Sequence, residues 1–100
     1  MSKEEQRFAI SADTVVRHAE GVLDGEMDDE VVLMSSANGE YYAMDRIGSR
    51  VWKLVATPRS LESVCRALCA EYDGSPGDVE RDVLAFAAEL LQKSLLRIEG

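Results

Sequence analysis

The dipeptide Asn38-Gly39, which divides the apolar segment EVVLMSSANGEYYAM, constrains the fold more than any other feature of this sequence. Both central residues of a type I′ turn have positive φ, a conformation that asparagine and glycine adopt readily, and such a two-residue loop joins two antiparallel strands. Counting outward from this loop, we predict that Leu33 pairs with Met44. The segment therefore predicts a β-hairpin over residues 31–44.

The predicted pairing gives this hairpin two largely apolar faces, because residues that pair across an antiparallel ladder point to the same side. A small sheet with one face open to water normally alternates apolar and polar residues. We therefore expect another element to cover each face. One face carries Val31, Leu33, Tyr42 and Met44, and the other carries Val32, Met34, Tyr41 and Ala43.

A strand is expected before the hairpin, and three helices are expected after it. The β-branched run TVVRHA, residues 14–19, predicts the strand, whereas the acidic, glycine-containing segment AEGVLDGEMDD, residues 19–29, is typical of a loop. The helices are predicted from apolar residues at helical spacing behind an N-cap. They are MDRIGSRVWKLVA capped by Asp45, SLESVCRALCAEY capped by Ser60, and SPGDVERDVLAFAAELLQKSLLRI capped by Ser75 with Pro76 in its first turn. This order predicts an α+β fold in which a three-stranded antiparallel sheet is followed by three helices.

The third predicted helix has an apolar arc about 200° wide when residues are placed 100° apart. One core-facing side needs little more than half of such an arc. Part of the helix therefore packs against a second surface or a partner, or the helix is wedged in the middle of the domain, and both alternatives stay open. One stripe contains Val79, Val83, Phe86, Ala87 and Leu90, and the other contains Leu84, Ala88, Leu91 and Leu95.

At 100 residues the chain has the size of one compact domain, which we place at residues 13–100 behind a flexible N-terminal arm of residues 1–12. The net charge of -8 disfavours phosphate backbones and anionic lipids as partners. The sequence has no apolar signal segment, and no stretch approaches the roughly 18 apolar residues of a membrane span. We therefore expect a cytoplasmic protein that binds neither nucleic acid nor membrane.

Few side chains in this sequence could carry catalysis. The only histidine, His18, has no sequence signal for a nucleophilic partner, and Trp52 is expected in the core. Cys65 and Cys69 share one helical face, where apolar packing is favoured over a metal site that would need four ligands. We expect no enzyme activity, no cofactor and no metal. The sequence instead favours a binding module, in which an extended peptide pairs with the free edge of the strand at residues 40–44.

Several motifs that are unspecific alone match one family in their order and spacing. The segment GEYYAMDRIGSRVWKLV, followed by TPRSLESVCRALCAEYDGSPGDVERDVLAFAAELLQKSLL, resembles the PqqD-like family, the RiPP recognition elements that bind leader peptides of ribosomally made, post-translationally modified peptides. The resemblance covers residues 14–98 and is greatest to the stand-alone recognition proteins of lasso-peptide pathways. The matching residues are Gly39, Tyr42, Met44, Gly48, Trp52, Leu68 to Tyr72, and, in the last helix, Asp82, Val83, Phe86, Leu90, Leu95 and Leu96.

The resemblance implies a winged-helix-like fold and a non-catalytic function. A leader peptide would lie extended as an added strand in a cleft between the third strand and the third helix. The protein would present this leader to a separate transglutaminase-like leader peptidase, after which a cyclase closes the ring. Which stripe of the last helix faces the peptide, and whether the protein is a monomer or a dimer, stay open. The predicted leader-binding residues are Glu40, Tyr41, Tyr42, Ala43, Met44, Arg81, Asp82, Leu84, Ala85 and Ala88.

A winged-helix nucleic-acid-binding or transcription-related protein is the alternative, because it would have the same pattern of strands and helices. The charge of the third predicted helix separates the two hypotheses, since a DNA-reading helix is normally basic. Here the helix is more acidic than basic, with Arg81, Lys93 and Arg97 against Asp78, Glu80, Asp82 and Glu89.

Overall fold

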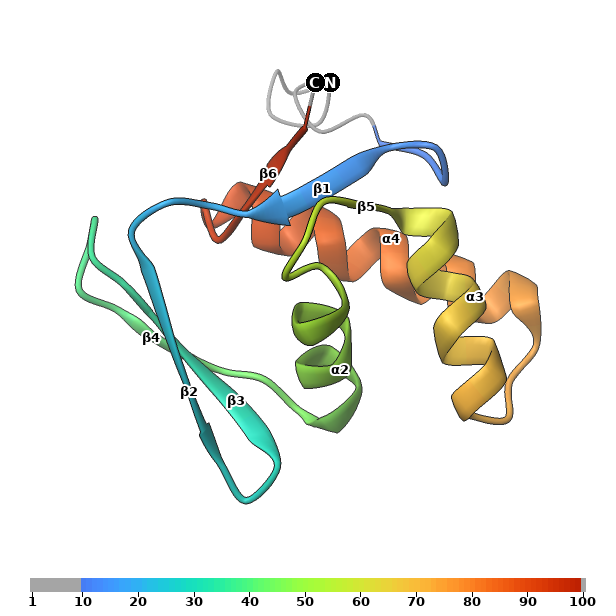
Figure 1. The fold of residues 1–100 in the computed structure, drawn as a ribbon, viewed down its shortest axis with the longest axis horizontal. Helices are drawn as coiled ribbons and strands as arrows, with labels where there is room; N and C mark the ends of the chain where they lie inside the picture. The colour runs from blue at the N-terminus through green and yellow to red at the C-terminus, as the bar shows by residue number, and fades with distance from the viewer. Residues whose placement is uncertain (1–9, 100) are drawn as a thin grey trace.

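The computed structural model describes residues 10–99, in which two antiparallel sheets and three helices surround one apolar core (Figure 1). Of the arm predicted at residues 1–12, residues 1–9 lie outside the described part, and Ile10 packs against the core. None of the helices within residues 10–99 has the length and apolar character needed to cross a bilayer. In chain order the elements are β1 (Val15–His18), β2 (Val22–Met27), β3 (Glu30–Ser35), β4 (Tyr41–Ala43), α2 (Arg46–Leu54), β5 (Arg59–Ser60), α3 (Leu61–Glu71), α4 (Pro76–Gln92) and β6 (Leu96–Ile98).

The α+β class and the three helices are confirmed, but the strands form two sheets instead of the single predicted one. The predicted first strand is β1, and it pairs with β5 and β6 instead of joining the hairpin. The other sheet has the strand order β2-β3-β4 and is called the meander sheet below. Figure 1 shows the meander sheet projecting to one side of α2.

The prediction of a loop over residues 19–29 was wrong, because this segment contains β2. The two-residue turn from β2 to β3 consists of Asp28 and Asp29, whose φ angles of 53° and 69° have the sign that a type I′ turn requires. Aspartate tolerates this left-handed region better than most residues because its short side chain can bond the local backbone. Two of the acidic residues that indicated a loop, Asp28 and Asp29, therefore form a hairpin turn.

Two acidic side chains of β2 have partners that are distant in the sequence. Asp24 Oδ2 accepts a hydrogen bond from Trp52 Nε1 at 2.8 Å, and Glu26 lies 3.0 Å from Lys53 Nζ. Trp52 is 2% exposed, which confirms its prediction as a core residue. Its other neighbour is His18, whose ring stacks on the indole at 3.5 Å and whose Nε2 lies 2.8 Å from the Trp52 carbonyl oxygen. Trp52 thus connects β1, α2 and the meander sheet.

The turn at residues 36–39 is a longer loop than the sequence predicted. Leu33 pairs with Tyr42 instead of Met44, so the predicted register was wrong. Within this loop only Gly39 has positive φ, at 71°, and the two-residue type I′ geometry is therefore absent from it. The pairing shifts by two residues, and because side chains alternate with a period of two, every side chain keeps its predicted face.

One face of the meander sheet is covered and the other is open. On the inner face Leu33 is fully buried, and α2 packs against β3. On the outer face Tyr41 is 71% exposed and Leu23 is 60% exposed. The prediction that an element covers each face was therefore wrong for the outer face, as far as residues 10–99 are concerned.

All three predicted N-caps are confirmed by hydrogen bonds to the first turns of their helices. Asp45 Oδ1 accepts from the backbone N–H of Gly48 at 2.7 Å. Ser60 and Ser75 make the equivalent bonds at the starts of α3 and α4. Each cap satisfies a backbone N–H that has no partner within its helix, which explains why these helices begin where the sequence indicated.

The last helix is shorter than predicted, because α4 ends at Gln92. Ser94 has a φ of 61°, and the chain then reverses into β6, which pairs with β1. Leu95 therefore follows the helix instead of extending its second apolar stripe. Both Leu91 and Leu95 are buried, and β6 packs against α4. Leu84 and Ala88 of the same stripe are only half-buried, so both alternatives for the wide apolar arc stay open.

Candidate functional site

The edge of β4 that faces away from β3 has no strand partner among the described residues. The backbone groups of Glu40 and Met44 bond to β3. In an antiparallel ladder these bonded positions alternate with positions whose backbone groups point to the other side of the strand. Tyr41 and Ala43 occupy the alternate positions, so their N–H and C=O groups point to the open edge. This edge can accept a further strand.

An apolar groove of about 430 Å³ lies between α2, α3 and α4. One of its lining residues is Asp45, which follows the end of β4 by two positions, so the groove adjoins the C-terminal end of this strand. Ile47 is 43% exposed here, which leaves it accessible to a ligand. The lining residues are Asp45, Ile47, Gly48, Val51, Leu68, Tyr72, Asp73, Val79, Asp82, Val83 and Phe86.

The groove depends on a close approach between α2 and α4 at Gly48. A Cβ atom added to this glycine would lie 2.9 Å from Cζ of Phe86 and 3.2 Å from Oδ1 of Asp45. Contacts shorter than 3 Å are repulsive, so a larger residue would displace the phenyl ring. Glycine at position 48 therefore allows Phe86 to lie against α2 and to form part of the groove wall.

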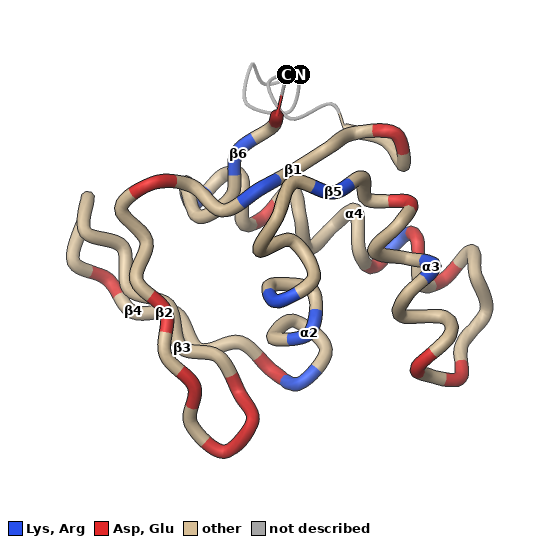
Figure 2. Tube along the Cα trace, in the orientation of Figure 1, with Lys and Arg blue, Asp and Glu red and all other residues tan. Residues whose placement is uncertain are grey.

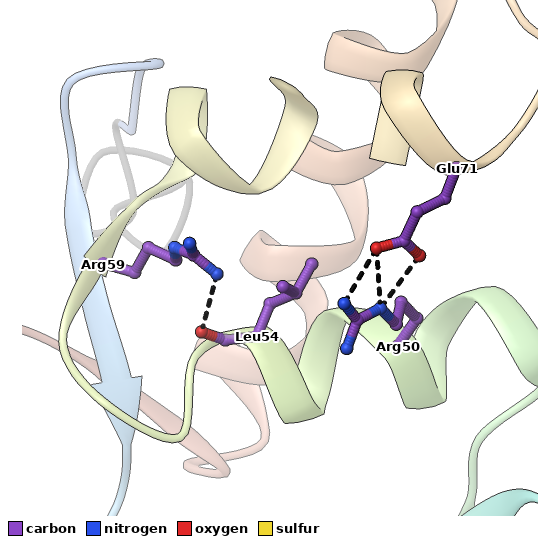
Figure 3. Close-up of polar contacts among 4 residues, drawn as sticks. All are labelled: Arg50, Leu54, Arg59 and Glu71. Atoms are coloured by element: carbon purple, nitrogen blue, oxygen red, sulfur yellow. Dashed lines mark hydrogen bonds and ion pairs between the residues drawn. The ribbon is translucent and has the colours of Figure 1, made fainter. Parts of the chain in front are cut away.

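The two helices on either side of the groove are joined by an ion pair between Arg50 of α2 and Glu71 of α3 (Figure 3). The Arg50 guanidinium donates to both carboxylate oxygens, with Nε 2.9 Å from Oε1 and Nη2 2.8 Å from Oε2. Figure 3 also shows Arg59 of β5, whose Nη1 donates to the carbonyl of Leu54 at the end of α2, at 3.5 Å. The hydrogen bonds from Arg50 lower the pKa of Glu71 below its ordinary value.

The pair predicts a pH-dependent stability difference between the wild type and Glu71→Gln. Because the pKa of Glu71 is lowered in the folded state, its stabilising effect is complete above the unfolded pKa and is lost as the pH falls through the folded pKa. The wild type should be the more stable protein at pH 7, and the difference should shrink below about pH 4. Urea unfolding at pH 7, 5 and 3 measures it. An unchanged difference between pH 7 and pH 3 would contradict this assignment.

The C-terminal end of α4 lies beside β4. Lys93 Nζ is 5.4 Å from the centre of the Tyr42 ring and 2.7 Å from Oε2 of Glu89. At 100° per residue, Phe86 and Asp82 lie within about 40° of Lys93 on the helix. One side of α4 therefore extends from the groove to the inner face of β4.

The predicted leader-binding residues divide into two groups. The strand residues Glu40 to Met44 adjoin the open edge, although Met44 is buried in the core. Of the α4 residues, Asp82 lines the groove, and Arg81 is exposed and paired with Asp78. Leu84, Ala85 and Ala88 do not line it, and Leu84 packs against the core.

Most of the groove lining was not predicted as a site. Gly48 and Phe86 belong to the motifs of the family resemblance, but nothing in the sequence shows that they meet. Ile47 lies at the apolar spacing of the first predicted helix, and this spacing alone does not distinguish a core residue from a groove residue. The groove lies where three helices meet. Helical periodicity predicts which face of each helix is buried, but it does not predict which other helix packs against that face.

The site lacks the groups of an activated nucleophile. The ring of His18 stacks on Trp52, and its Nε2 is hydrogen-bonded to the Trp52 carbonyl oxygen. Cys65 is a free, buried thiol, and burial raises its pKa, which disfavours the reactive thiolate. Cys69 is free and half-buried. Within residues 10–99, no group of three or more His, Cys, Asp or Glu side chains is placed to hold a metal ion. The arrangement suits binding.

An open strand edge next to an apolar groove defines a class of small domain suited to an extended peptide, which adds a strand and places side chains in the groove. Comparison with known proteins identifies the family. The family model of coenzyme PQQ synthesis protein D (PqqD) matches residues 30–96, and the chain belongs to this family.

A curated relative gives the same assignment over a shorter stretch. The PqqA binding protein of Xanthomonas oryzae pv. oryzae strain PXO99A is 38% identical over 55 residues, which are 55% of this chain and 60% of that protein. The equivalent proteins of strains KACC10331 and MAFF 311018 match equally. The chain thus spans less than two thirds of these relatives.

Solved structures match over more of the chain. TbiB1 in complex with the TbiA(beta) leader peptide is 37% identical, with a TM-score of 0.76 and coverage of 84% of this chain and 95% of TbiB1. The PqqD part of Methylobacterium extorquens PqqCD, a RiPP recognition element, is 26% identical with a TM-score of 0.77, covering 92% and 98%. A lasso peptide synthetase B1 bound to its leader peptide is 22% identical with a TM-score of 0.75, covering 82% and 96%, and shares the fold.

Proposed function

We propose that this chain is a non-catalytic RiPP recognition element that captures the leader of a lasso-type precursor peptide as an added strand on β4. The observation that carries the proposal is the open edge of β4, where the backbone groups of Tyr41 and Ala43 point outward beside the groove. The 37% identity to TbiB1, which was solved with a leader peptide, supports the same reading.

The leader binds in two parts, a strand and an anchor. A strand rises about 3.3 Å per residue, so the segment from Tyr41 to Ala43 spans about 10 Å and offers two N–H and two C=O groups. Four hydrogen bonds at about 1 kcal/mol each give only a few kcal/mol and do not distinguish sequences. The leader therefore continues past Asp45 into the groove, where buried apolar side chains add affinity and selectivity.

The function of the complex is delivery. A bound leader is presented to a separate transglutaminase-like leader peptidase, and a cyclase then acts on the released core peptide. Holding a flexible substrate near an enzyme raises its effective concentration without a new catalytic group. This division of labour agrees with a site that contains no activated nucleophile.

Titration of fluorescent leader peptides from lasso-type precursors, beginning with the TbiA(beta) leader that was solved with TbiB1, tests the proposal. Saturable binding is expected with a dissociation constant in the micromolar range or below, and a scrambled leader of the same composition serves as control. Amide chemical shifts should change most in β4 and along the groove. Equal binding of the leader and its scrambled version would contradict the function.

A further inference from the structure

The ladder between β3 and β4 is interrupted by a side chain at its last pair. In the register of this sheet Val31 lies opposite Met44, one step beyond the pair of Val32 and Ala43. The N–H of Met44 donates to the Val31 carbonyl at 2.8 Å, which is one of the two bonds that such a pair exchanges. The N–H of Val31 does not return the second bond, because it donates to Oγ of Ser49 in α2 at 2.7 Å.

The Ser49 hydroxyl takes the place of this second bond. Its oxygen accepts from Val31, and its O–H donates to the carbonyl of Met44 at 3.4 Å. The hydroxyl therefore lies between the two backbone groups that would bond each other in a regular ladder. Ser49 is 2% exposed, so bulk water does not compete for these bonds. The end of β4 is held to α2 and β3 through one buried side chain.

This bridge fixes the peptide group that joins Met44 to Asp45. In a trans peptide the C=O and the N–H point in opposite directions. The Met44 carbonyl points toward Ser49, so the N–H of Asp45 points to the open edge, as the N–H groups of Tyr41 and Ala43 do. Within residues 10–99 the N–H of Asp45 donates to no acceptor.

Asp45 also continues the strand in its backbone conformation. Its φ of -74° and ψ of -176° are extended, and α2 begins only at the next residue. The open edge therefore has a third N–H beyond the end of β4. Because Asp45 also lines the groove, this third donor lies where the edge and the groove adjoin.

The other polar contacts between α2 and the meander sheet are made at the opposite edge of the sheet. Figure 2 shows acidic residues along the meander sheet and basic residues along α2. The ion pair of Lys53 with Glu26 and the hydrogen bond of Trp52 with Asp24 both reach β2. Among the residues that the structure describes, Ser49 is the one side chain of α2 that bonds β3 and the residue after β4.

We propose that Ser49 is a positioning residue for leader binding. Its hydroxyl holds the Met44 carbonyl so that the N–H of Asp45 donates to a backbone carbonyl of the leader, where the leader passes from the edge of β4 into the groove. This inference rests on the proposed function. It adds a third backbone donor to the two that Tyr41 and Ala43 offer.

Removing the hydroxyl would release this peptide group. In Ser49→Ala the N–H of Val31 loses its partner, and a buried N–H without a partner is unfavourable. If it bonds directly to the Met44 carbonyl, Asp45 is drawn toward β3 and away from the leader. If it does not, the Met44 carbonyl has no partner and the peptide group can rotate. A shift of about 1 Å is enough to break a bond whose usual length is about 2.7–3.2 Å.

The test measures amide hydrogen exchange by NMR, with and without leader, in the wild type and in Ser49→Ala. The leader is the lasso-type peptide that binds most tightly in the titration above, beginning with the TbiA(beta) leader. Ser35→Ala is the matched control. Ser35 is 3% exposed and lies in the same sheet, at the other end of β3, so this variant removes a similarly buried hydroxyl away from the bridge.

In the wild type, leader binding is expected to slow exchange at Tyr41, Ala43 and Asp45 by about tenfold or more. In Ser49→Ala the protection of Asp45 should be lost while Tyr41 and Ala43 stay protected, and the dissociation constant should rise about fivefold. General destabilisation would not select one amide in this way. Ser35→Ala should keep the wild-type pattern and affinity.

An unprotected Asp45 in the leader-bound wild type would overturn the positioning role, and this measurement decides even if Ser49→Ala does not fold. Full protection of Asp45 or unchanged leader affinity in Ser49→Ala would overturn it as well. The proposed function fails separately if the wild type shows no saturable leader binding, or no protection of Tyr41 and Ala43, and this inference then fails with it.

Discussion

Replacing Ala43 with proline is expected to weaken leader binding by about 30-fold or more while the protein stays folded. The N–H of Ala43 points to the open edge of β4, so its removal takes no hydrogen bond from the pairing with β3. Proline is tolerated on an edge strand when the missing N–H faces solvent. A bound leader would then bury a carbonyl without a partner and would meet the proline ring, which together cost about 2 kcal/mol or more.

Ala43→Val is the matched control for this experiment, because it keeps the N–H and places its side chain on the outer face, away from the added strand. Its leader affinity should stay within about twofold of the wild type. Thermal unfolding of both variants verifies that the sheet is intact. Wild-type affinity in a folded Ala43→Pro protein would show that the leader does not pair with β4.

The faces of the hairpin were predictable from the sequence although its register was not. The side-chain period of two depends on the pattern alone, so the sequence correctly placed Val31 and Leu33 on one face, although it predicted that both faces would be covered and only this face is buried. The register depends on the loop, and here only Gly39 adopts the positive φ that was expected at two positions. Local turn preference is a weak constraint when a longer loop can join the same two strands in another register.

The second strand was missed because its stabilising contacts are distant in the sequence. Asp24 and Glu26 look like loop residues until the indole of Trp52 and the ammonium of Lys53 are placed beside them. The separation of the terminal strands into their own sheet has the same origin. Short strands such as β5 and β6 exist only because β1 lies between them.

The candidate site was predictable in outline and not in detail. The strand that carries the open edge followed from the hairpin, and the participation of the last helix came from the family resemblance. The helix wheel could not select the stripe nearest the strand, and the contact of Lys93 with Tyr42 and the packing of Phe86 on Gly48 provide that information. The orientation of a helix depends on all of its core contacts together, and these contacts cannot be derived from the pattern of one helix alone.

Ile47→Asp is expected to reduce leader affinity by about tenfold to 100-fold. Ile47 is exposed at the groove, so its replacement removes an apolar contact for the leader without opening a cavity in the core. An aspartate there would be desolvated by a bound leader, close to the carboxylates of Asp45, Asp73 and Asp82 that already line the groove. Desolvation of an unpaired charge and repulsion between like charges both oppose binding.

The same substitution should leave the fold intact, which makes a loss of binding interpretable. Position 47 lies in the first turn of α2, where a negative charge interacts favourably with the helix dipole, so the melting temperature should be equal to or above that of the wild type. Ile47→Met keeps an apolar side chain of similar size and should bind the leader normally.

Leu84→Glu tests the opposite stripe of α4, which does not line the groove. If Leu84→Glu loses leader affinity in a folded protein while Ile47→Asp retains it, the leader lies along that stripe, and the groove between α2, α3 and α4 is not the anchor site.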